Sequence, residues 1–131
     1  MDRMLVKDYM TRNLVTLQPG MDIMQAINVL CENRVPGAPV MDSSGNFVGI
    51  LVERDCLSAA LNAAYHEQSG GRVEDFMHRQ VDVVEAEDNI TDVANQLISS
   101  GHRGMPVISN NILVGMINRS DILKALVKCM S

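Results

Sequence analysis

The chain has 131 residues, of which 47% are hydrophobic and 21% charged, and its formal net charge at pH 7 is −5. This composition is typical of a compact folded protein and excludes a long disordered chain. No apolar run reaches the roughly 20 residues that cross a bilayer, and the first residues lack a secretory signal. We therefore expect a cytoplasmic protein with no membrane contact. Its arginines and lysines are scattered, which disfavours nucleic acid as a partner.

The first half of the chain predicts two helices and three strands in the order β-α-β-β-α. A short apolar run at residues 14–17 predicts a strand. Apolar residues at i, i+3, i+4, i+7 and i+8 from Ile23 to Cys31 predict an amphipathic helix. Strands at residues 38–41 and 47–52 follow, joined by a short polar turn. A second helix is expected at residues 54–64.

The second half repeats this order after a polar, glycine-bearing connection at residues 65–72. The expected strands lie at residues 81–84, 105–108 and 113–117, and the expected helices at residues 90–98 and 119–128. The three cysteines, Cys31, Cys56 and Cys129, show no metal-ligand spacing. We expect them to be buried structural thiols, with no metal site and no disulfide framework.

An internal repeat explains why the two halves look alike. With a shift of 67 residues, residues 6–12 fall on residues 73–79, and Pro39-Val40 fall on Pro106-Val107; after the hairpin turn the shift becomes 66. The repeat predicts two domains, residues 1–66 and 67–131. Because a unit of about 60 residues is marginally stable alone, we expect an α/β (α+β) fold in which two β-α-β-β-α units pack sheet to sheet with pseudo-two-fold symmetry.

The duplicated motifs resemble those of the CBS domain. They are an opening Val-x-Asp-aromatic-Met-x-Arg at residues 6–12 and 73–79, the two Pro-Val pairs, and a Gly that precedes an Asp by six residues, at Gly49/Asp55 and Gly115/Asp121. The chain thus resembles a tandem CBS domain pair (Bateman module) of a stand-alone CBS-domain protein. The resemblance implies a non-catalytic regulatory module that requires no cofactor and binds an adenosine nucleotide, AMP or ATP, in a cleft between its halves. It also implies a homodimer and an effector enzyme or transporter on another chain.

The resemblance places the ligand at the start of the last helix of each half. A carboxylate in the first helical turn can accept hydrogen bonds from ribose hydroxyls, and Asp55 and Asp121 hold that position. Helix capping is the alternative role of both residues. The hydroxyl side chain that the family carries three residues earlier is replaced by Val52 in the first half and by Asn118 in the second.

These replacements predict one strong site, in the second half. The residues expected there are Asn118, Arg119, Ser120, Asp121, Arg103 and His102; the first half offers Asp55 and Arg54, and Arg54 also suits a purely solvated role. By resemblance, an adenine slot would be formed by Leu14, Val15 and Thr16, with either Ala38-Pro39 or Met105-Pro106 opposite. For Val15 and Met105 a plain core position is the alternative.

Two other functions compete with ligand sensing. A dimerisation or scaffold module with empty clefts is the first, and Val52 in place of a hydroxyl favours it. An enzyme is the second, and it would need a nucleophile, a base or a metal in mutual reach. Because the sequence offers no such constellation, we expect no catalysis.

Overall fold

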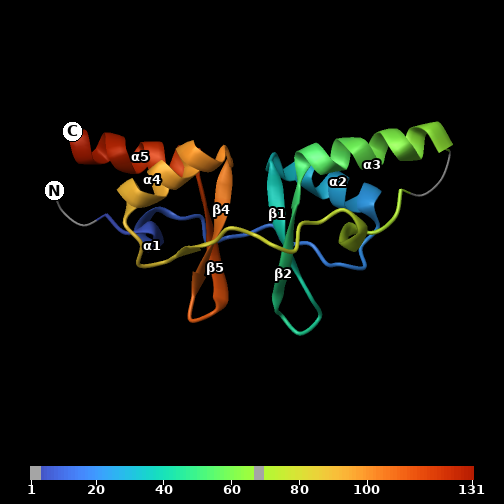
Figure 1. Cartoon of the computed structure of the whole chain (residues 1–131), viewed down its shortest axis with the longest axis horizontal. Helices are drawn as coiled ribbons and strands as arrows, with labels where there is room; N and C mark the ends of the chain where they lie inside the picture. Colours follow the sequence, from blue (N-terminus) through green and yellow to red (C-terminus); the bar gives the residue numbers. More distant parts are fainter. Residues whose placement is uncertain (1–3, 67–69) are drawn as a thin grey trace. The chain divides into compact units, whose positions relative to one another are not determined.

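The computed structural model describes residues 4–66 and 70–131 (Figure 1). The chain divides into two compact units: unit 1 combines the described part of Met1–Leu14 with Asp82–Ser131, and unit 2 is Val15–Val81. The mixed α+β class predicted from the sequence is confirmed. The domain boundary between residues 66 and 67 stays a prediction drawn from the sequence repeat.

Unit 2 is a two-stranded hairpin with its helices on one side (Figure 1). Strand β1 (Gly37–Met41) pairs antiparallel with β2 (Phe47–Val52), and helix α2 (Ile23–Asn33) packs against α3 (Glu53–His66). The side chain of Asp22 begins α2 by accepting a hydrogen bond from the Gln25 N–H. The core joins the helices to the strands, and its buried residues are Leu17, Ile23, Ala26, Leu30, Ala38, Val40, Leu51, Cys56, Ala59 and Val73.

Unit 1 repeats this plan with one more strand. Its sheet has the order β3 (Val84–Glu85), β4 (Gly104–Ser109) and β5 (Ile112–Asn118); β3 is parallel to β4, and β4 is antiparallel to β5. Helices α4 (Ile90–Ser100) and α5 (Arg119–Met130) lie on one side of this hairpin (Figure 1). Its core consists of Met4, Val6, Val84, Ala86, Ile90, Val93, Leu97, Met105, Val107, Ile117, Ile122 and Ala125.

Each unit consists mainly of one sequence repeat and is completed by the first residues of the other repeat. We call residues 4–14 the first opening segment and residues 70–81 the second. The first contains helix α1 (Val6–Tyr9) and contributes Val6 to the core of unit 1; the second contains the 3-10 helix η1 (Val73–Asp75) and contributes Val73 to the core of unit 2. Both valines are fully buried. The exchange therefore rests on apolar burial, the largest favourable contribution to folding.

Hydrogen bonds attach the two opening segments in the same way. The first N–H of α4, from Ile90, donates to the carbonyl of Met4 at 2.8 Å, and the first N–H of α2, from Ile23, donates to the carbonyl of Gly71 at 2.9 Å. Each opening segment thus satisfies a backbone donor that a helix start leaves without a partner in its own helix.

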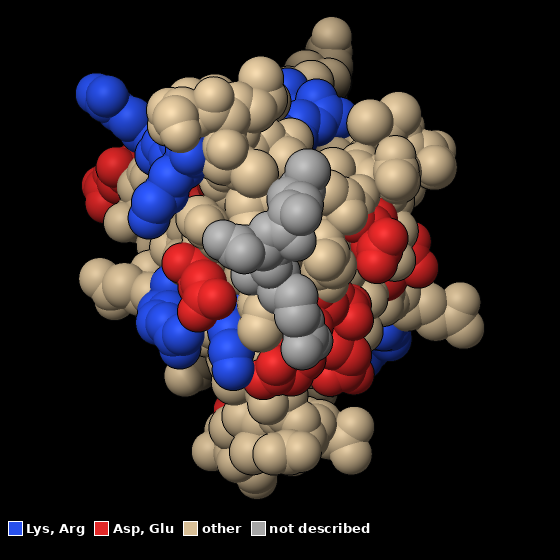
Figure 2. Space-filling model, turned by 90° about the vertical axis from the view of Figure 1, so that its left-hand side faces the viewer, with Lys and Arg blue, Asp and Glu red and all other residues tan. Residues whose placement is uncertain are grey.

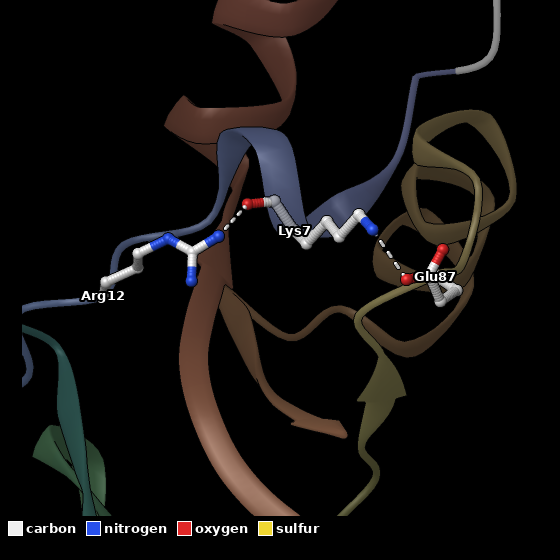
Figure 3. Close-up of polar contacts among 3 residues, drawn as sticks. All are labelled: Lys7, Arg12 and Glu87. Atoms are coloured by element: carbon white, nitrogen blue, oxygen red, sulfur yellow. Dashed lines mark hydrogen bonds and ion pairs between the residues drawn. The ribbon is translucent and has the colours of Figure 1, made fainter. Parts of the chain in front are cut away.

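Two polar contacts at the surface involve the first opening segment: one attaches it to Glu87, and the other lies within the segment (Figure 3). The Lys7 ammonium lies 2.7 Å from Glu87, which raises the pKa of Lys7, and the Arg12 guanidinium donates to the carbonyl of Lys7 at 2.9 Å. Because these side chains are exposed to solvent, the ion pair contributes little to stability.

Several expectations about the elements are corrected by the structure. In the predicted strand at residues 14–17 only Leu17 forms a bridge, to Val40, because only its backbone groups reach β1; the strand predicted at residues 81–84 is Val84–Glu85. The short helices α1 and η1 are too brief to show a helical period. Helix α3 extends to His66, past the predicted end, and part of the expected connection, residues 67–69, lies outside the described residues.

The cysteine prediction holds for Cys56 only, since Cys31 and Cys129 are exposed. Cys31 and its counterpart Ile98 stand at position i+8 of their helices. Eight residues at 3.6 per turn rotate a side chain about 80° away from the first one, so both residues leave the buried stripe at its edge.

Candidate functional site

The opening segments lie directly beside the strands that lead into α3 and α5. In unit 1, Thr11 and Met116 exchange two backbone hydrogen bonds, at 2.8 and 3.0 Å; in unit 2, His78 and Ile50 do the same, at 2.9 and 2.8 Å. Thr11 and His78 are equivalent residues of the two repeats. Each is therefore held near the start of the helix that follows the strand.

Two glycines make this close approach possible. A Cβ on Gly49 would lie 2.5 Å from the carbonyl oxygen of His78, and one on Gly115 would lie 2.8 Å from that of Thr11. Atoms at such distances clash. The glycine of the repeated Gly-Asp spacing is thus required for the packing of the opening segments.

In unit 1 the predicted ligand residues Asn118 and Asp121 form a capping box at the start of α5. The Asn118 side chain accepts from the Asp121 N–H at 2.8 Å, and the Asp121 Oδ2 accepts from the Asn118 N–H at 3.0 Å. The hydroxyl of Thr11 lies 3.4 Å from the same Oδ2. The capping role is thus present, and Oδ1 accepts no hydrogen bond from the described residues.

Unit 2 handles the equivalent carboxylate differently. Val52 stands in the place of Asn118 and has no side-chain acceptor, while the Oδ2 of Asp55 lies 2.5 Å from the Nε2 of His78. The side chain of Asp55 is 30% exposed and that of His78 is 50% exposed. An imidazole therefore contacts Asp55 where a small hydroxyl faces Asp121.

The predicted basic residues of unit 1 meet through hydrogen bonds to their backbone carbonyls, while their side chains have different partners. The Arg119 guanidinium donates to the carbonyls of Gly101 and His102 at 3.0 and 3.2 Å, which follow the end of α4, and the His102 ring pairs with Asp82 at 3.2 Å. Only the backbone of Arg103 joins them, as its carbonyl accepts from the Arg119 N–H at 3.1 Å. Arg119 thus satisfies carbonyls that follow the end of α4, and its role beside a phosphate stays a prediction.

The residues predicted to line an adenine slot are mostly core. Ala38 and Pro39 in β1, and Met105 and Pro106 in β4, are buried, and Met105 belongs to the core of unit 1. Val15 packs against the core of unit 2. Of the other slot residues, Leu14 is half-buried and Thr16 is exposed. Arg54 and Ser120, which are predicted at the helix starts, are exposed as well.

Sequence reasoning missed Thr11 and His78 as candidate site residues. Their signal was present, because the repeat aligns them and both follow a methionine. What the sequence does not show is that each returns to a carboxylate of the other repeat: Thr11 and Asp121 are separated by 110 residues.

The surface contains features of other kinds as well. An open groove on α5 is lined by Ser120, Leu123, Lys124, Val127 and Lys128. Figure 2 shows basic side chains mainly on the left and at the top of one face, and acidic side chains mainly at its lower centre and right. Within residues 4–66 and 70–131, no group of three or more His, Cys, Asp or Glu could hold a metal ion, and none of the helices there is long and apolar enough to span a membrane.

Comparison with known proteins identifies a family. The family described as CBS domain matches the chain twice, at residues 6–62 and 73–128. An uncharacterized protein of Methanocaldococcus jannaschii is 31% identical over 92% of the chain, which spans 42% of that relative's length.

Solved structures share the fold over nearly the whole chain. One of them is the crystal structure of CBSX2, a protein of Arabidopsis thaliana, in complex with AMP. It has a TM-score of 0.85 and 28% sequence identity, and the match covers 97% of this chain and 98% of the CBSX2 chain. A CBS domain pair in complex with 5-methylthioadenosine and S-adenosyl-L-methionine has a TM-score of 0.82 and 24% identity, with 98% and 99% covered.

Proposed function

Because the chain belongs to the CBS domain family, we propose that it is a regulatory module that binds an adenosine nucleotide and signals its presence to a partner, without catalysis. AMP and ATP are the proposed ligands, in a cytoplasmic protein. The partner is an effector enzyme or a transporter on another chain. The complex of CBSX2 with AMP supports the ligand class.

The observation that carries this proposal is the carboxylate of Asp121. It is held at the start of α5 by the Asn118 capping box, and its Oδ1 accepts no hydrogen bond from the described residues. A carboxylate fixed in this way can accept hydrogen bonds from ribose hydroxyls without first losing side-chain freedom. The Arg119 and Asp121 N–H groups at this helix start already donate to the Arg103 carbonyl and the Asn118 side chain, so the proposal rests on the carboxylate.

A thermal-shift screen tests the proposal. The purified protein is melted with AMP, ADP, ATP, S-adenosylmethionine and NAD, because a ligand that binds only the folded state raises Tm by mass action. We expect a concentration-dependent rise with at least one adenosine ligand and none with adenine or ribose 5-phosphate alone. A flat response to all five ligands would favour the scaffold function instead.

We further propose that the chain forms a homodimer through an exposed apolar stripe on α3 and its counterpart on α5. The stripe on α3 consists of Leu57, Leu61 and Tyr65; the stripe on α5 consists of Leu123, Val127 and Met130, and all six side chains are exposed. Large exposed apolar surfaces mark interaction sites.

Leu61→Lys tests the dimer, because a charge in the middle of the stripe would have to be buried on association. Light scattering after size exclusion should show a monomer for this variant and a dimer for the wild type. Ile98→Lys is the matched control, since Ile98 is an exposed apolar residue of α4, outside the stripes. An unchanged dimer in Leu61→Lys would contradict this interface.

A further inference from the structure

We propose that His78 closes the carboxylate of Asp55 to ribose, whereas Thr11 leaves that of Asp121 open, so that each chain binds one adenosine ligand, in unit 1. The inference rests on the proposed function and names the residue that makes its two potential sites unequal. It is drawn from contacts within each unit.

The imidazole of His78 stands where a ribose hydroxyl would have to be. Its Nε2 lies 2.5 Å from the Oδ2 of Asp55, and a hydroxyl that donates to a carboxylate lies about 2.5–2.7 Å from the accepting oxygen. The ring takes one acceptor position of Oδ2, and its bulk crowds the approach of a ribose hydroxyl to that oxygen. A ribose diol that uses both carboxylate oxygens would reach Oδ2 only after the ring has rotated away.

The backbone of His78 keeps the ring in reach of Asp55. His78 exchanges two hydrogen bonds with Ile50, and Gly49 lets its carbonyl lie against β2. The ring can leave the carboxylate only by rotation of its own side chain, because its attachment point is fixed.

Thr11 is a weaker and smaller neighbour of Asp121. Its hydroxyl lies 3.4 Å from Oδ2, well beyond the usual 2.7–2.8 Å of an O–H···O hydrogen bond. A hydroxyl both donates and accepts, so Thr11 can stay in place and bond to a ribose hydroxyl that arrives at Asp121. The residue at this repeat position thus selects which unit takes the ligand.

Exchange of the two residues tests this selection. Isothermal titration with AMP, ATP and S-adenosylmethionine is carried out on the wild type, His78→Thr, Thr11→His and the double exchange. We expect one site per chain in the wild type and a second site in His78→Thr, with an affinity for unit 2 raised at least about tenfold by the regained charge-assisted hydrogen bond. Thr11→His should weaken the wild-type site by a similar factor.

Controls separate the roles of fold and site. Arg79→Ala, in the exposed residue next to His78, should keep one site, and His78→Ala should open unit 2 like His78→Thr. Asp121→Asn should weaken the site of the wild type about tenfold but not that of the double exchange. Circular dichroism melts verify that each variant is folded.

Two results would overturn the inference. Two equal sites in the wild type, or stoichiometry and affinity that do not respond to either exchange, would show that His78 does not close unit 2, while ligand binding itself would stand. Binding of none of the three ligands to any variant would overturn the proposed function, and this inference with it.

Discussion

Substitution of Gly49 by alanine should detach the second opening segment from β2. The added Cβ would lie 2.5 Å from the carbonyl oxygen of His78 and 3.2 Å from the sulfur of Met77. The closer contact is with backbone, so the segment must move as a whole. Movement breaks the two hydrogen bonds between His78 and Ile50 and pulls His78 away from Asp55.

The expected loss follows from these contacts. Each backbone hydrogen bond contributes about 1 kcal/mol net, so the loss of two lowers the free energy of unfolding by about 2 kcal/mol. For a protein of this size, that change lowers Tm by roughly 5–10 °C. The half-exposed pair of His78 with Asp55 adds little to this sum.

Differential scanning calorimetry and urea unfolding measure the effect, with Gly20→Ala as the matched control in the same unit. A Cβ on Gly20 meets no atom closer than 3.9 Å, and its φ is not left-handed, so this control should melt within about 3 °C of the wild type or slightly above it. If Gly49→Ala melts like Gly20→Ala, the close approach at β2 does not hold the segment, and the account of the repeated glycine is wrong.

Three further predictions concern binding, thiol reactivity and backbone strain. Asp121→Ala should weaken AMP binding by about 1–3 kcal/mol, the loss of a charge-assisted acceptor, and Asp55→Ala by less; equal losses in calorimetry would contradict unequal sites. Burial raises the pKa of the Cys56 thiol to about 11, so its thiolate fraction at pH 8 is on the order of 10⁻³. An aromatic disulfide reagent should therefore label the two exposed cysteines of the native protein but reach Cys56 only in denaturant. Rapid native labelling of all three thiols would refute this. Arg34→Gly should raise the free energy of unfolding by about 0.5–1 kcal/mol. Arg34 follows α2 with a left-handed φ of 54°, whereas glycine, Gly101, holds the equivalent position after α4. If urea unfolding shows a lower free energy of unfolding, the arginine side chain makes a contact worth more than the strain.

The helices and hairpins were predictable because their patterns are periodic and long enough to count. Ile23, Ala26 and Leu30 of the predicted stripe are buried as expected, and Ile27 is partly buried. Both hairpins lie within a residue or two of their predicted bounds. At Asn110 and Asn111 the second hairpin turns with left-handed φ values of 53° and 65°, which asparagine tolerates in a two-residue turn.

The opening segments were not predictable, for a physical reason. Helix α1 has four residues and η1 three, less than the two turns that a 3.6-residue period needs to become visible. Their burial depends on contacts with residues more than 80 positions away along the chain in unit 1, as between Val6 and Asp88, and a single sequence contains no record of such contacts.

The candidate site shows the same limit at the level of side chains. Asp121 was predicted from its place in the first helical turn, and the structure holds it there. Arg119 is predicted near a phosphate because of its charge, and that role stays a prediction. In the structure its Nε and one terminal nitrogen donate to the carbonyls after α4. Charge indicates what a side chain can bind, whereas the backbone acceptors within its reach are not visible in the sequence.

The repeat also explains how one fold can hold two unequal sites. Duplication conserves what packing demands, and the two glycines and two aspartates that seat the opening segments are kept in both units. The residue that faces each carboxylate is exposed, so packing constrains it weakly. Thr11 and His78 differ, while both units keep a buried apolar core. A change at a single exposed position can therefore alter ligand binding in one unit while the fold of both units stays the same.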